Sequence, residues 1–128
     1  MIKILAIGDV CGPCGLETLR RKLNQVKAKT GADLVVVNGE NAGGRGLVPD
    51  MAEQIFFAGA DVITLGNHTF DQKSIYDYLD ERKNIVRPAN LSSARRLRLY
   101  LCGGQGQKGG RPQHDGPPVH GLYEQRPL

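Results

Sequence analysis

Four short apolar runs alternate with segments in which apolar residues repeat at helical spacing, and this alternation constrains the fold more than any other feature. The apolar runs cover residues 2–7, 34–37 and 62–65, and a fourth begins at residues 85–86. The helical segments between them cover residues 16–29, 49–58 and 72–82. Short, nearly continuous apolar runs are typical of buried parallel strands. The pattern therefore predicts an α/β fold with right-handed crossovers, in which helices cover both faces of a parallel sheet.

Charge and composition divide the chain of 128 residues into two regions. Residues 1–91 carry eleven basic and eleven acidic side chains, whereas residues 92–128 carry six basic and two acidic ones and so supply the whole net charge of +4. Gly and Pro are also denser after residue 91. We therefore expect one domain over residues 1–91, followed by an irregular, poorly ordered Gly/Pro/Arg-rich tail over residues 92–128.

The same features exclude several classes of protein. No apolar run approaches the roughly 20 residues that a membrane span needs. The apolar start breaks at Gly8-Asp9, which is unlike a signal peptide. Three cysteines are too few for a disulfide framework. We therefore expect a soluble cytoplasmic protein in a reducing compartment, without a membrane partner.

Polar residues follow three of the apolar runs, at the points where the predicted strands end. Asp9 follows the first run, Glu40 and Asn41 follow the second, and Asn67 and His68 follow the third. The carboxyl ends of parallel strands meet at one edge of an open sheet, where such folds bind their ligands. Carboxylates, amides and an imidazole suit hard or borderline divalent metals. We therefore expect a divalent-metal site at this edge, although Asp9 alone fits helix capping equally well.

Three motifs at this edge resemble those of a known enzyme family. Gly8-Asp9-Val10, Asn38-Gly39-Glu40-Asn41-Ala42 and Gly66-Asn67-His68-Thr69 are similar, in order and spacing, to the opening motifs of the calcineurin-like metallophosphoesterases. The similarity is greatest to the YmdB-like branch, which Pro49 and Arg87-Pro88-Ala89-Asn90 also match. The resemblance covers residues 1–91. It implies that the chain forms the first half of a four-layer α/β/β/α sandwich. It also implies a phosphoesterase, of the phosphodiesterase type that acts on cyclic nucleotides.

The resemblance also implies a role for each residue of the site. Asp9 would bind the first of two divalent metal ions, Glu40 would bridge both, and Asn67 would bind the second, with iron or manganese expected. Asn41 would line the site, and His68 would protonate the leaving oxygen of a small phosphoester or phosphodiester. The ions would clamp the phosphoryl group and activate a water. Because the family's further histidine ligands lie beyond the matched part, we expect weak activity or none from this chain.

Cys11-Gly12-Pro13-Cys14 offers a different interpretation, a thioredoxin-like dithiol protein. Its spacing, and its place between a predicted strand and a predicted helix, are those of a redox site. Val10, however, stands where thioredoxin-like sites have an aromatic residue, and no later proline loop stands out as a partner. We therefore interpret Cys11 and Cys14 as packing residues of the turn. The nearby Gly43-Gly44-Arg45-Gly46 lacks the Lys-Ser/Thr of a phosphate loop, which predicts a flexible loop with Arg45 facing solvent.

The tail permits two interpretations. A basic, Gly-rich segment is compatible with nucleic-acid binding, which would make the chain a non-catalytic binding remnant. Alternatively, the codons of residues 102–125, read one nucleotide later, permit the sequence VEVKGKKVAVLNMMGRLFMDYTNS. This string alternates like a strand, turns and continues as a second apolar strand, and it resembles the next segment of the same family. We therefore expect a frameshift near residues 91–101. A homo-oligomer is compatible with either interpretation.

Overall fold

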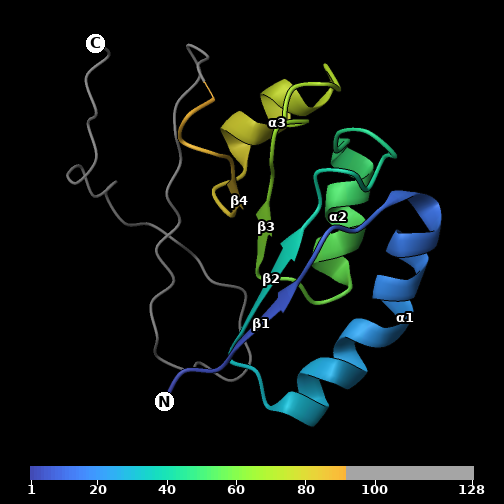
Figure 1. The fold of residues 1–128 in the computed structure, drawn as a ribbon, viewed down its shortest axis with the longest axis vertical. Coiled ribbons are helices and arrows are strands. Elements are labelled where there is room, and N and C mark those ends of the chain that lie inside the picture. Colours follow the sequence, from blue (N-terminus) through green and yellow to red (C-terminus); the bar gives the residue numbers. More distant parts are fainter. Residues whose placement is uncertain (92–128) are drawn as a thin grey trace.

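Strands and helices alternate along the chain as the apolar pattern predicts (Figure 1). The computed structural model describes residues 1–91, so the predicted tail and the predicted frameshift lie outside the described residues. In chain order the elements are β1 (Ile4–Ile7), α1 (Gly12–Thr30), β2 (Leu34–Asn38), α2 (Pro49–Phe57), β3 (Val62–Thr64), α3 (Ile75–Glu81) and β4 (Ile85–Val86). The four strands form one parallel sheet in the order β1-β2-β3-β4.

The helices cover one face of this sheet, so the expectation that they cover both faces is wrong for the described residues. Figure 1 shows α1 and α2 on the same side of the sheet. Tyr78 and Arg82, in and just after α3, both contact Glu53 of α2, which joins α3 to that layer. The physical reason is the strand order. Right-handed crossovers change faces only where the order of the strands reverses, and here each strand follows its predecessor in one direction.

The hydrophobic core lies between the helices and the sheet. Val35, Val37 and Ile63 are fully buried on the face of the sheet that the helices cover. The helices contribute buried residues at the predicted spacing, namely Leu16, Leu19 and Leu23 from α1 and Ala52 and Ile55 from α2. This layer fixes the sheet against the helices and so fixes the positions of the loops at the ends of the strands.

The first strand is shorter and more exposed than the apolar run at residues 2–7 predicts. β1 begins at Ile4, and the side chains of Ile2 and Ile4 are 65% and 61% exposed. Leu5 and Ile7 are partly buried and pack against the core. Exposure is high because β1 is an edge strand and no described residue forms a layer over the second face of the sheet.

The helices begin and end at local capping and turn signals rather than where the helical spacing of apolar residues begins and ends. α1 begins at Gly12 rather than at residue 16, because Pro13 fits the first turn of a helix. It ends at Thr30, and its C-cap is Gly31, whose φ of 63° is a left-handed conformation that favours glycine. α3 begins at Ile75 rather than at residue 72, since residues 72–74 form a turn. No helix in residues 1–91 is long and apolar enough to cross a membrane.

Candidate functional site

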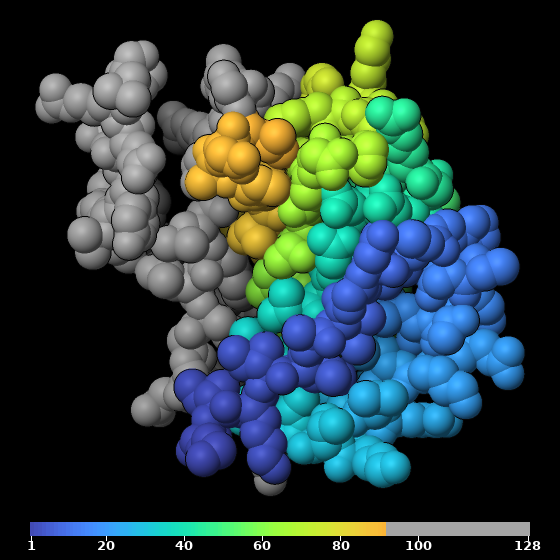
Figure 2. Space-filling view, viewed as in Figure 1, coloured from blue at the N-terminus to red at the C-terminus, as the bar shows by residue number. Residues whose placement is uncertain are grey.

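The loops that follow β1, β2 and β3 meet at the carboxyl edge, the edge of the sheet where these three strands end. The backbone N–H of Gly12 donates to the carbonyl of Asn41 at 2.9 Å, which joins the first loop to the second. The N–H of Gly39 donates to the carbonyl of Thr64 at 3.0 Å, which joins β2 to β3. In the space-filling view the loops after β2 and β3 lie against each other at the upper end (Figure 2). The predicted site residues therefore lie on one edge of the sheet.

Asp9 is held at this edge by its neighbours and does not cap the first helix. The Asn41 side-chain amide, through Nδ2, donates to both carboxylate oxygens of Asp9, at 3.0 and 3.1 Å. The Cys11 thiol donates to Asp9 Oδ2 at 3.2 Å, and this hydrogen bond raises the pKa of the Cys11 thiol. The N-cap of α1 is Cys11, without a side-chain capping bond. The capping alternative for Asp9 is therefore wrong.

Glu40 reaches across to the loop after β3. Its Oε2 accepts a hydrogen bond from the backbone N–H of His68 at 3.4 Å. Its carboxyl group lies directly over Gly66, where a Cβ atom would overlap with it. Gly66 therefore provides the space in which the Glu40 carboxylate lies between the second and third loops.

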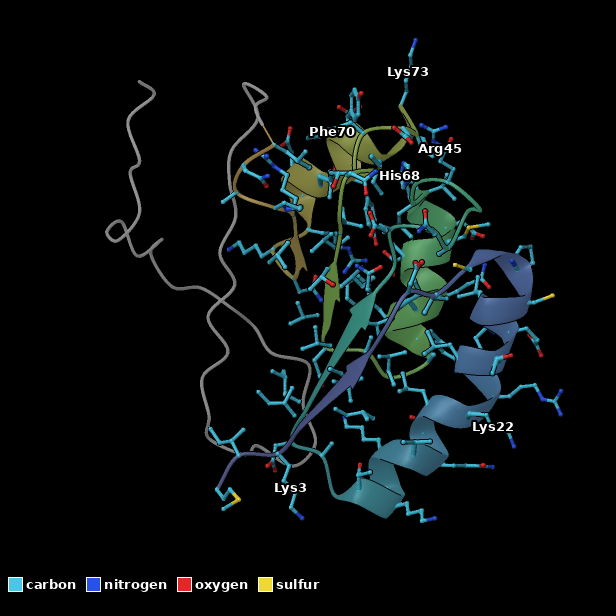
Figure 3. All side chains as sticks on the ribbon, in the orientation of Figure 1. Lys3, Lys22, Arg45, His68, Phe70 and Lys73 are labelled. Atoms are coloured by element: carbon cyan, nitrogen blue, oxygen red, sulfur yellow. The ribbon has the colours of Figure 1, made fainter. Side chains whose placement is uncertain are left out.

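His68 is held at both ring nitrogens. Its Nδ1 lies 2.7 Å from Asp71 Oδ2, and its Nε2 lies 3.2 Å from Asn67 Nδ2. Because a carboxylate only accepts hydrogen bonds, Nδ1 carries the proton toward Asp71, and Nε2 of the neutral ring accepts from Asn67. Arg45 Nε also lies 2.7 Å from Asp71 Oδ2. Figure 3 shows Arg45 and His68 near each other at the carboxyl edge, with Lys3 at the opposite end of the sheet.

Asp71 and Arg45 belong to the site, although no role was predicted for Asp71. The hydrogen bonds from Arg45 and then from His68 hold the pKa of the Asp71 carboxyl below its usual range. Asp71 is therefore ionised at neutral pH. The sequence feature that could have predicted this contact is the position of Asp71 three residues after His68, which places both residues in one turn. Arg45 faces solvent as predicted, with 74% of its side chain exposed, while its guanidinium contacts Asp71.

The donor atoms at the carboxyl edge suit a divalent cation in chemistry but form an incomplete set. Asp9, Glu40, Asn41 and Asn67 offer carboxylate and amide oxygens, which hard cations prefer. They lie in two hydrogen-bonded groups, Asp9 with Asn41 and Glu40 with the loop of His68. Within residues 1–91, no three His, Cys, Asp or Glu side chains are close enough together to hold a metal ion. The residues present therefore fit part of a metal site.

The packing interpretation of the two cysteines is wrong. Cys11 and Cys14 are both exposed, and both are free thiols. The turn packs instead through Val10, which is buried, and a Cβ atom on Gly15 would lie 3.4 Å from it. The Cys11 side chain turns toward Asp9 because the carboxylate accepts its S–H, so the motif lies at the carboxyl edge and not in the core.

Replacing Gly66 should disturb the Glu40 carboxylate without unfolding the domain. In Gly66→Ala the new Cβ takes the space of the carboxyl group, which moves because it ends a flexible side chain. We expect Mn²⁺ affinity to fall by about 10–100-fold, as it does when groups that orient metal ligands are lost. Gly8→Ala is the matched control, since a Cβ there meets nothing within 4 Å. Equal Mn²⁺ affinities of the two variants by calorimetry would show that Glu40 takes no part in binding.

Comparison with known proteins places the chain in a family. Residues 5–104 match the model of the YmdB-like protein family. A 2',3'-cyclic-nucleotide 2'-phosphodiesterase of Bacillus subtilis is 42% identical over 91 residues, which cover 70% of this chain and 34% of the relative. A putative phosphatase/phosphodiesterase of Mycoplasma pneumoniae is 42% identical over 94 residues, which cover 73% and 34%. The chain thus spans about a third of the length of the curated relatives it matches.

Solved structures agree with these matches. A crystal structure of a novel phosphatase from Mycoplasma pneumoniae has a TM-score of 0.67 and 40% identity, and covers 71% of this chain and 33% of that one. A hypothetical protein from Thermus thermophilus has a TM-score of 0.68 and 35% identity, and covers 79% and 40%. The parallel sheet, its edge motifs and the match over most of the chain lead to one conclusion: the chain belongs to the YmdB-like protein family.

Proposed function

We propose that this chain carries the amino-terminal part of the active site of a metal-dependent phosphodiesterase that acts on cyclic nucleotides. The observation that carries the proposal is the convergence of Asp9, Glu40, Asn67 and His68 from three strand ends onto one edge. A relative that matches over this region is named as a phosphodiesterase of 2',3'-cyclic nucleotides. The substrate is then a small phosphodiester and the expected compartment is the cytoplasm.

The carboxylates and amides would hold the metal ions. Asp9 would hold the first ion, Asn67 would hold the second and Glu40 would serve both, while Asn41 keeps the Asp9 carboxylate in place through its two hydrogen bonds. Bound iron or manganese would supply Lewis acidity and a water of lowered pKa. Because Asn67 is neutral, it leaves more of the positive charge of the second ion for the phosphate than a carboxylate would.

His68 would deliver the proton that the leaving oxygen needs. In its protonated form, Nδ1–H donates to Asp71 and Nε2–H points away from Asp71, toward the position of Asn67 Nδ2. An amide nitrogen cannot accept that proton, so a leaving oxygen is the better partner for Nε2. Asp71 fixes the orientation of the ring, and Arg45 fixes Asp71.

Removing the Asp71 carboxylate tests this arrangement. In a catalytically active form of the protein, Asp71→Ala should reduce kcat by about 10–100-fold with little change in KM, because the ring of His68 loses its orienting partner. Asp77→Ala, a substitution of the same type on α3, is the control. The measurement is the pH profile of kcat. If the variant and the parent have the same kcat and the same pH profile of kcat, Asp71 has no part in the mechanism.

The complete activity requires residues that the matched part does not supply. We propose that the reading frame shifts near residues 91–101 and that the present chain binds metal weakly and turns over little or no substrate. Shifting the reading frame by one nucleotide near codons 91–101, with the gene continued, should restore soluble expression and binding of about two metal ions. It should also restore metal-dependent hydrolysis of 2',3'-cyclic AMP. An early stop codon in the shifted frame would refute the frameshift, and a restored protein without this hydrolysis would refute the proposed function.

A further inference from the structure

Two cysteines flank the first turn of α1 beside the Asp9 carboxylate. Cys11 is the N-cap of the helix, and Cys14 lies three residues later, within its first turn. Both are exposed free thiols, so small reagents have access to both. The phosphodiesterase proposal assigns no role to either residue.

The backbone places the two cysteines on one turn of the chain. The backbone N–H of Gly15 donates to the carbonyl of Cys11 at 3.1 Å, which closes a turn that contains both Cys11 and Cys14. Residues on one such turn lie near each other, and a disulfide spans a Cα separation of about 4.4–6.8 Å. Cys11 makes no side-chain capping bond, so its thiol can turn toward Cys14 without breaking one. Gly12, with φ of 59°, and Pro13 hold the backbone between them.

We propose that Cys11 and Cys14 form a reversible disulfide that alters the hydrogen bonding of Asp9. The oxidant is a low-molecular-weight disulfide such as oxidised glutathione. One thiolate attacks it to give a mixed disulfide and one glutathione, and the second cysteine then displaces the other glutathione. Overall, the two cysteine S–H bonds and the S–S bond of oxidised glutathione break, and the Cys11–Cys14 S–S bond and two glutathione S–H bonds form, so the two electrons and two protons end on two glutathione thiols.

Oxidation removes one of the hydrogen bonds that the Asp9 carboxylate accepts. In the reduced chain, Asp9 Oδ2 accepts from the Cys11 thiol at 3.2 Å and from Asn41. In the disulfide, Cys11 has no S–H to donate and its sulfur is drawn toward α1. More of the Asp9 carboxylate is then available to a cation. The oxidised chain should therefore bind Mn²⁺ severalfold more tightly than the reduced chain, a consequence that rests on the proposed metal-binding role of Asp9.

The test for the disulfide uses the full chain with Cys102→Ser, which leaves Cys11 and Cys14 as its two cysteines. The protein is equilibrated in buffers of reduced and oxidised glutathione, quenched with acid, alkylated, and measured by intact and peptide mass. We expect both alkylation sites to disappear together, with an internal link between Cys11 and Cys14. The single variants Cys11→Ser and Cys14→Ser should accumulate the glutathione adduct instead. Independent alkylation of the two cysteines, or adducts on both without a link, would overturn the proposal.

Calorimetry with Mn²⁺ then separates this proposal from the proposed function. Tighter binding by the oxidised chain supports the coupling to Asp9, and equal binding by both forms overturns the coupling. A chain that forms the disulfide but binds no Mn²⁺ in either form contradicts the proposed metal site while the redox pair stands. A chain that binds Mn²⁺ but forms no disulfide contradicts the redox pair alone.

Discussion

Replacing His68 with alanine in the frame-restored protein should reduce turnover by about 10²–10⁴-fold while the metal stays bound, because that range is typical for the loss of a general acid. In the proposed function His68 would transfer a proton, and no metal-ligand role is proposed for it. Its Nδ1 contacts Asp71 and its Nε2 contacts Asn67. The measurement combines kcat for 2',3'-cyclic AMP with metal content by elemental analysis.

Lys73→Ala is the matched control for this experiment, since Lys73 lies in the segment that follows β3 and points away from the site (Figure 3). Its turnover should equal that of the parent. We expect His68→Ala to reduce turnover more when the leaving group is a poor one, because such a group depends more on protonation. A His68→Ala variant with full turnover on a poor leaving group would show that another group delivers the proton.

The second large effect concerns the core. Ile63→Ala should reduce the free energy of unfolding by about 2–5 kcal/mol, the range for deleting a buried isoleucine side chain to Ala. Ile63 is 0% exposed in the middle of β3 and packs in the core between sheet and helices. Since domains have about 5–15 kcal/mol of stability in total, the variant should lose a large fraction of it. Urea unfolding followed by circular dichroism measures the change.

Ile4→Ala provides the matched control in the same sheet. Ile4 is 61% exposed, so its replacement should change the free energy of unfolding by no more than about 0.5 kcal/mol. Equal losses for the two variants would mean that the face of the sheet bearing Ile4 is covered in solution, by a second copy or by another part of the polypeptide.

Sequence predicted the order of elements and the residues of the carboxyl edge because both depend on local pattern. Each strand of the described sheet lies within or at a predicted apolar run, and the polar residue after each of the first three lies at the strand end. Placement of the helices on one face was missed. Strand order is set by tertiary packing, and no local pattern distinguishes an order of β1-β2-β3-β4 from one that reverses.

Side-chain partners at the site were harder to predict than side-chain positions. The contact of Asp71 with Arg45 joins residues 26 positions apart, so it depends on how two loops meet. Exposure of Cys11 and Cys14 was also missed, because a short helix start with apolar neighbours is typical of a packed turn. Asp9 draws the Cys11 thiol outward, and that interaction depends on the side-chain positions of both groups, which the sequence pattern does not set.

Calorimetric titration of the present chain with Mn²⁺ tests most directly whether the carboxyl edge is a metal site. We expect weak binding by the parent chain, because Asp9, Glu40 and Asn67 would supply only part of a coordination shell. Glu40→Gln should abolish this binding. Glu17→Gln, which changes an exposed side chain of α1, should leave it unchanged. Binding that survives Glu40→Gln at the parent's affinity would contradict the account.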